Sequence, residues 1–168
     1  STVHRVNAYR VCGVVEAGYL LNDLTVEIIA DGMHLPYELL QMVYKIKGAD
    51  RTALVTDAMR GAGMPEGIET VLGKLDNGLP CRIEKGVAWM LDGQAFAGSV
   101  ATTDRLVRTM VAAGIPLVDA VKMASETPAK MAKCPQKGTL DAGKDADIVI
   151  FDESINMQHV FVRGKQIV

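Results

Sequence analysis

The sequence predicts an α/β fold that joins barrel units of alternating strands and helices to a layer of β hairpins. Two apolar runs, at 25–30 and 52–57, each lead directly into a polar group and a loop, as parallel strands buried on both faces do. Residues 68–95 instead alternate and turn like antiparallel strands. In a barrel, chemistry lies at the carboxyl ends of the strands, so the residues that follow the two apolar runs are the first candidates for a site.

Composition sets limits on function. The chain has 168 residues, of which 49% are hydrophobic, enough to bury one core, and no apolar run is long enough to span a membrane. Its 18 basic residues are scattered among 20 acidic ones, which argues against nucleic acid and membrane partners and leaves a small molecule. Three widely spaced cysteines suit a reducing cytoplasm. The chain begins Ser-Thr-Val-His, with no initiator Met, so we expect a fragment of a longer protein.

The first half of the chain is expected to form a helix, strand, helix, strand passage. A helix over 13–21 leads into the strand at 25–30. Pro36 can occupy the first turn of a helix over 36–47, which Gly48 closes. After the strand at 52–57 comes a loop over 59–67, so rich in Gly that it must turn tightly or let something approach the backbone.

The second half is expected to start with β structure, turn helical and then return to strands. Residues 81–84 and 87–90 alternate between tight turns, as in a hairpin. Helices are predicted over 102–113, capped by Thr102 or Thr103, and over 117–125, with a further helical turn from Pro128. Strands are predicted at 147–152 and 158–163.

Four motifs resemble, in this order, the C-terminal part of the N-acetylglucosamine-6-phosphate deacetylase family. They are residues 26–34, ending in Ala-Asp-Gly-Met-His, residues 54–59, residues 96–99 and residues 137–147. The last motif alone indicates only the wider amidohydrolase superfamily. The resemblance implies the last part of a metal-dependent hydrolase (β/α)8 barrel, at residues 1–67 and 96–134. It also implies the C-terminal strands of a small β-sandwich, at residues 68–95 and 135–168.

The resemblance also implies an activity. The family removes the acetyl group of N-acetylglucosamine 6-phosphate with a divalent metal ion, zinc or iron, giving glucosamine 6-phosphate and acetate. It further implies a homodimer, with the main metal ligands upstream, so that this fragment alone should be inactive. Two alternatives remain open: another amidohydrolase, acting on a cyclic amide or an N-acyl amino acid, and a noncatalytic assembly or binding subunit.

Asp57 is the candidate catalytic residue. An Asp after a buried strand often only caps the following turn, and the residues alone favour that role. The resemblance reverses the preference, because Asp57 matches the family's Asp that takes a proton from the metal-bound water and passes it to the leaving amine. This chemistry requires a carboxylate held rigidly within hydrogen-bond reach of the water.

The candidate substrate contacts are His34 and the run Ala97, Gly98 and Ser99. A lone His in a loop is more often a surface residue, but His34 follows a barrel strand, where a neutral imidazole could bond a substrate carbonyl or hydroxyl. Asp31 is expected to orient this loop through its side chain. Small residues at 97–99 would let a loop approach the substrate, although Gly-Ser before a helix is also ordinary turn chemistry. By resemblance, both segments contact the sugar phosphate.

The N-terminal candidates are Arg10 and His4. By resemblance Arg10, with Arg5 in reserve, matches an Arg that binds the substrate phosphate across a dimer interface, although the family's Pro is missing from Arg10-Val-Cys-Gly. A planar guanidinium suits phosphate, while a solvated surface Arg is the ordinary alternative. His4 superficially matches a metal-binding His of the family, but its distance to Arg10 is too short, so we assign no metal ligand in this chain.

Overall fold

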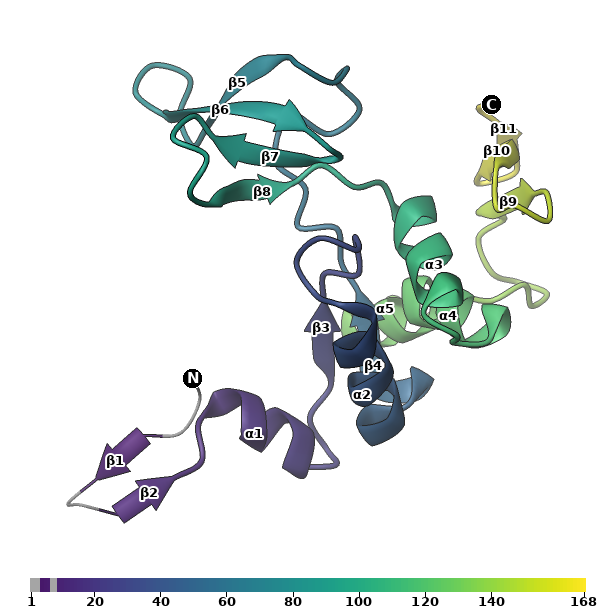
Figure 1. Cartoon of the computed structure of the whole chain (residues 1–168). Coiled ribbons are helices and arrows are strands. Elements are labelled where there is room, and N and C mark those ends of the chain that lie inside the picture. Colours follow the sequence, from purple (N-terminus) through teal and green to yellow (C-terminus); the bar gives the residue numbers. More distant parts are fainter. Residues whose placement is uncertain (1–3, 7–8) are drawn as a thin grey trace.

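The computed structural model describes the backbone of residues 4–6 and 9–168 and the side chains from residue 11 onwards. It is a mixed α/β structure (Figure 1). The strands are β1 (His4–Val6), β2 (Tyr9–Val11), β3 (Val26–Ile28), β4 (Thr52–Leu54), β5 (Glu69–Leu72), β6 (Leu79–Glu84), β7 (Val87–Met90), β8 (Phe96–Ser99), β9 (Ile148–Phe151), β10 (Met157–Val162) and β11 (Lys165–Gln166). The helices are α1 (Val14–Leu20), α2 (Tyr37–Lys47), α3 (Thr103–Ala112), α4 (Leu117–Ala124) and α5 (Glu126–Met131), with a 3-10 turn, η1, at Ala49–Arg51.

The unit β3, α2, β4 confirms the parallel strands predicted from the two apolar runs. Val26 pairs with Thr52 and Ile28 with Leu54 in parallel register. Helix α2 starts after Pro36 and ends at Lys47, and the next residue, Gly48, has a φ of 68°, a positive value that glycine adopts without strain. Both strands are shorter than expected, because past Ile28 and Leu54 only one further ladder bond continues, from the Val55 N–H to the Ile28 carbonyl at 3.0 Å.

Strands β5 to β8 form one antiparallel sheet in sequential order, which confirms the predicted hairpins. One expectation for this region was wrong. Residues 97–99 are not a loop but part of β8, where Ser99 pairs with Val87 and Gly98 with Ala88. The alternation that makes β8 a strand buries Ala97 and Ser99 and leaves Phe96 exposed. The domain boundary predicted between residues 95 and 96 therefore lies directly before β8, a strand that is hydrogen-bonded to β7.

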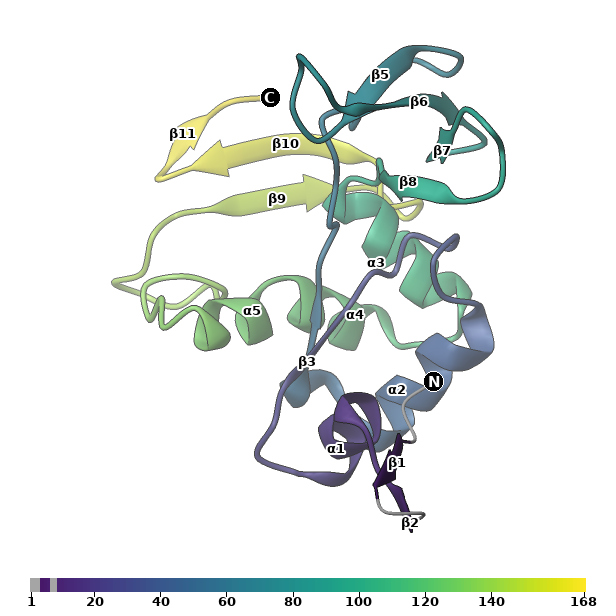
Figure 2. The same cartoon turned by 90° about the vertical axis from the view of Figure 1, so that its left-hand side faces the viewer.

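Helices α3 to α5 follow β8; α4 and α5 pack against β4, and α3 packs against α4 (Figure 2). Thr102 is the N-cap residue of α3, as predicted, although its side chain makes no capping hydrogen bond. Helix α5 begins at Glu126, two residues before Pro128, because the first turn of a helix tolerates a proline. The main core is apolar and combines both halves of the chain; its largest fully buried members are Leu40, Val43, Leu106, Met110 and Met123.

The remaining strands form separate sheets. Strands β9 to β11 make a three-stranded antiparallel sheet with β10 in the centre. Among the described residues this sheet shares no strand pairing with β5–β8, and the two are apart in Figure 1. A closed sandwich of the two therefore stays a prediction, as does the complete barrel. The β1–β2 hairpin and α1 lie at the end of the molecule opposite the β5–β8 sheet in both views.

Candidate functional site

The loop after β3 is organised by Asp31, whose side chain is completely buried. Its Oδ1 accepts hydrogen bonds from the backbone N–H groups of Met33 and His34, both at 2.9 Å. Its Oδ2 lies 2.8 Å from Nδ1 of the His34 ring. Gly32, at a φ of 78°, allows the turn that brings these donors to one carboxylate. The expectation that Asp31 orients this loop is confirmed.

These hydrogen bonds decide the charge of Asp31. Burial by itself would raise the pKa of a carboxyl group, because it removes water from the charged form. The backbone donors of His34 and Met33, together with the His34 ring, outweigh burial and lower the pKa of Asp31 below its usual value. Asp31 is therefore a carboxylate, and so acts only as an acceptor, at neutral pH.

His34 contacts a second element besides Asp31. Its ring lies 5.3 Å from the ring of Phe96, centroid to centroid, and the two planes are tilted by 58°. Phe96 in turn meets the Trp89 ring edge to face, at 4.6 Å. About a quarter of the His34 side chain remains exposed. The imidazole is thus held by a carboxylate and an aromatic ring while part of it faces solvent.

Asp57 lies three residues beyond the last residue of β4, on an exposed segment. Its φ is 44°, a left-handed conformation that few residues other than glycine adopt, and that Asp adopts more readily than most. Such backbone conformations cost of the order of 1 kcal/mol and concentrate at functional sites. The following residues are attached to β8: Ala58 forms a parallel bridge with Ser99, and the Met59 N–H donates to the Ser99 carbonyl at 2.9 Å.

Strand β8 therefore brings three of the predicted segments together. Phe96 contacts His34 from the β3 loop, and Ser99 pairs with the segment that follows Asp57. Within β8, Ala97 and Ser99 are buried, and the Ser99 hydroxyl accepts a hydrogen bond from the Ala101 N–H at 3.1 Å. Gly98 is only partly buried, so its backbone is the part of the run 97–99 most open to a ligand.

The N-terminal candidates are placed only as backbone. Arg10 lies in β2 opposite Arg5, and His4 lies in β1 opposite Val11. Their side chains lie outside what the structure describes. In both views the hairpin is distant from β8, so the structure does not bring these residues to the site formed around that strand.

Sequence reasoning missed two side chains at this site, Phe96 and Trp89. A signal for Phe96 was present, because it directly precedes the small residues at 97–99. The contact with His34 joins positions 62 residues apart, however, and no local pattern reports it. Trp89 carried no signal beyond its place in an alternating strand.

The described residues do not by themselves fit a divalent metal ion. From residue 11 onwards, where side chains are described, no three His, Cys, Asp or Glu side chains converge as ligands. A structural or catalytic metal needs about three or four such ligands from the protein. We therefore derive no chemical step through a metal from these residues.

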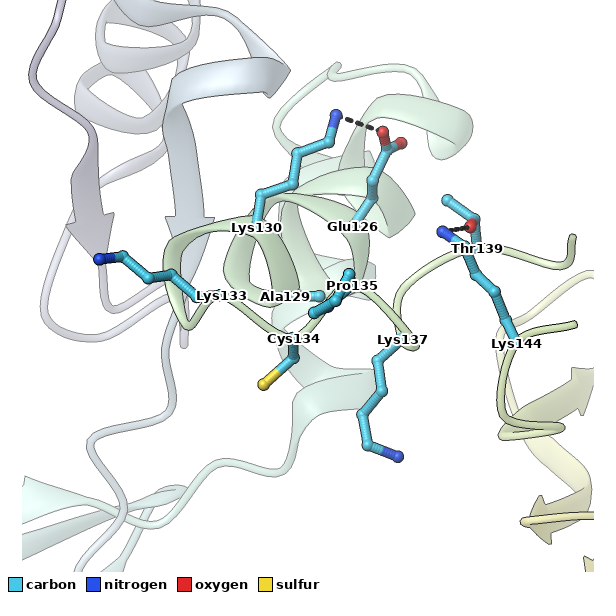
Figure 3. Close-up of a pocket in the computed structure, with 9 residues that line it drawn as sticks. All are labelled: Glu126, Ala129, Lys130, Lys133, Cys134, Pro135, Lys137, Thr139 and Lys144. Atoms are coloured by element: carbon cyan, nitrogen blue, oxygen red, sulfur yellow. Dashed lines mark hydrogen bonds and ion pairs between the residues drawn. The ribbon is translucent and has the colours of Figure 1, made fainter.

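A cavity of about 530 Å³ lies away from this site, beside α5 (Figure 3). Four lysines line it, and lysine is a residue type that an anion site uses. Lys130 is already paired with Glu126 at 2.5 Å, and Lys137 bonds both Asp145 and Asp147. Figure 3 shows the lysine side chains pointing in different directions rather than to one centre. The cavity contains none of the predicted site residues.

Residues 5–167 match the amidohydrolase family, and the chain belongs to this family. Among its relatives is an N-acetylglucosamine-6-phosphate deacetylase of Lysinibacillus sphaericus, 36% identical over 91% of this chain and 38% of the relative. A putative N-acetylgalactosamine-6-phosphate deacetylase of Escherichia coli K12 is 33% identical over 94% of this chain and 91% of that protein.

Solved structures agree with these relatives. The N-acetylglucosamine-6-phosphate deacetylase of Thermotoga maritima superposes with a TM-score of 0.83 at 31% identity, over 94% of this chain and 42% of that one. A Mycobacterium smegmatis deacetylase variant in complex with N-acetyl-D-glucosamine-6-phosphate gives 0.83 at 30% identity, over 99% and 43%. This chain thus spans about two fifths of the length of most of these proteins. The family expected from the motifs is confirmed.

Proposed function

We propose that the whole protein containing this chain hydrolyses the acetamide of N-acetylglucosamine 6-phosphate, releasing acetate and glucosamine 6-phosphate. The observation that carries the proposal is the meeting of the Asp57 segment and the His34 loop at strand β8. These are three of the four motifs that resemble the deacetylases, and three of the four relatives named above carry that activity in their names.

The proposed roles follow from chemistry and exposure. Asp57, an exposed carboxylate on a constrained backbone, accepts a proton from the attacking water and returns it to the leaving amine. His34 contacts the sugar, and the backbone around Gly98 lies against the bound substrate. Arg10 binds the phosphate, reaching it from the second protomer of a homodimer. A cytoplasmic location belongs to the same proposal.

Amidohydrolases are generally metal-dependent, and the proposal includes a divalent ion, zinc or iron. The described side chains do not form a set of metal ligands. In this proposal the ligands of the ion therefore belong to other parts of the protein. His4 remains a candidate whose side chain is not described.

The proposal is tested by assaying the whole protein for acetate release with four substrates. These are N-acetylglucosamine 6-phosphate, N-acetylgalactosamine 6-phosphate, an N-acyl amino acid and a cyclic amide. We expect the first to be turned over with the highest kcat/KM. Preference for either of the last two would replace the proposal with another amidohydrolase activity. Absence of turnover together with absence of stoichiometric metal would favour an assembly subunit.

A further inference from the structure

The proposed reaction requires only that His34 contact the sugar, yet the structure places a buried carboxylate directly behind its ring. Asp31 is 1% exposed and has three donors, two from backbone N–H groups and one from the imidazole. The two backbone bonds already shape the loop. The third, 2.8 Å long, acts on the orientation and the proton of the ring.

A neutral imidazole carries one N–H donor and one nitrogen with a lone pair, and its neighbours decide which is which. An ionised carboxylate can only accept, so a 2.8 Å contact with Oδ2 requires the proton to be on Nδ1. In the neutral ring the lone pair is then on Nε2, for which no protein partner is present among the described residues.

The Asp31 bond favours one of the two orientations of the His34 ring, and Phe96 adds a second contact to it. A half-turn about the Cβ–Cγ bond would present a carbon to Asp31 in place of Nδ1. The Phe96 ring packs against the imidazole at 5.3 Å and is itself packed against Trp89, so the two aromatic rings help to fix the plane of the His34 ring. The carboxylate sets the tautomer and the aromatic pair helps to keep it.

We propose that Asp31 is a positioning residue that fixes His34 as the Nδ1–H tautomer, so that Nε2 accepts a hydrogen bond from the ligand. Resting on the proposed function, this specifies the group that His34 recognises: a sugar hydroxyl or the acetamide N–H. A neutral His34 held in this way cannot donate to the acetamide carbonyl oxygen. The sequence alone left carbonyl and hydroxyl equally open.

The test is the long-range proton–nitrogen NMR spectrum of the whole protein with 15N-labelled histidine, at about pH 8.5, where an ordinary imidazole is neutral. The His34 signals are assigned by their loss in His34→Gln. We expect Nδ1 to have the chemical shift of a protonated ring nitrogen and Nε2 that of an unprotonated one. In Asp31→Asn the signals should move toward the Nε2–H tautomer that free histidine favours, while Asp23→Asn, in an exposed turn, leaves them unchanged.

A wild-type spectrum with the proton on Nε2, or an average of both tautomers, overturns the proposal. So does an Asp31→Asn spectrum identical to wild type. If Asp31→Asn does not fold, the wild-type spectrum decides alone, and Phe96→Leu should then show a partial loss of the Nδ1–H form. The readout does not depend on turnover, so a protein that lacks deacetylase activity can still confirm the tautomer.

Discussion

At the scale of single residues, Asp57 and His34 differ in how they are held. His34 is fixed through its side chain by Asp31 and Phe96, whereas Asp57 is fixed through its backbone, by a left-handed φ and the bridge of the next residue to Ser99. A carboxylate that must exchange protons with water is best left exposed, and a ring that must recognise one group is best held in one orientation.

Asp57→Asn should therefore abolish turnover of the acetylated sugar phosphate while leaving the fold and substrate binding intact. In the whole protein we expect kcat to fall by about three orders of magnitude, since an amide cannot accept the proton of the attacking water. Steady-state kinetics and a thermal unfolding curve measure both properties. The control is Asp76→Asn, which changes another exposed Asp in the β5–β6 turn and should behave as wild type. A loss of only about tenfold would remove Asp57 from its proposed role.

His34→Gln should weaken the handling of the substrate without unfolding the protein. The side chain is partly exposed and lies in a loop, so its contribution to the core is small. We expect kcat/KM for the acetylated sugar phosphate to fall by about tenfold to a hundredfold. The unfolding temperature should change little, and His159→Gln, at an exposed position, is the control. Unchanged kinetics, or a protein that no longer folds, would favour a purely structural histidine.

At the scale of elements, helix α1 depends on a side chain that belongs to α2. Helix α1 has seven residues, none of them fully buried, although Tyr19 packs against the core, so it gains less from packing than the other helices. Lys47, buried near the end of α2, donates from Nζ to the carbonyls of Gly18 at 2.8 Å and Leu21 at 2.9 Å. These are carbonyls at the end of α1 that lack partners within the helix. Lys47 thus ties the end of α1 to α2.

Lys47→Met, which keeps an apolar stem and removes the cation, should release α1. We expect a loss of about 1–3 kcal/mol in the free energy of unfolding, because two carbonyls lose a charged donor. Amide hydrogen exchange should become faster in residues 14–20 and stay unchanged in α3. Lys45→Met, on the exposed side of the same helix, is the control. Equal exchange in the two variants would show that α1 is held by something else.

At the scale of the whole molecule, the β3–β4 pair is an incomplete sheet. Each strand has one hydrogen-bonded neighbour among the described residues, so one edge of each is open. Apolar side chains are exposed elsewhere too: Val14, Leu20, Leu75, Val118 and Leu140 are each at least 74% exposed. Open edges and exposed apolar side chains are the features by which protein surfaces associate.

The purified 168-residue chain should therefore self-associate or bind a hydrophobic dye. Multi-angle light scattering measures the mass of the species in solution, and dye fluorescence reports accessible apolar surface. We expect a mass above the 18.0 kDa of one chain, a strong dye signal, or both. A monodisperse monomer that binds no dye would show that the chain completes its own core, against the prediction of a partial barrel.

The sequence alone was sufficient for features that depend on nearby residues. Pro36 and Gly48 determine the ends of α2 because each restricts or permits backbone conformations at its own position. Two apolar runs predicted the parallel pair, and the motif order predicted the family that the relatives confirm. Asp31 at the turn after β3 was predictable too, because it bonds donors only two and three residues away.

Only the tertiary structure decided where the strands stop and what surrounds His34. Strand length depends on the partner strand, so β3 and β4 end where their common ladder ends, short of the apolar runs. Residues 97–99 form a strand because they pair with the edge of β7. Phe96 contacts His34 because β8 lies beside the loop that follows β3. Local preferences act within a few residues. The contacts described here join segments about 60 residues apart or depend on pairing with another strand. Only packing brings such partners together.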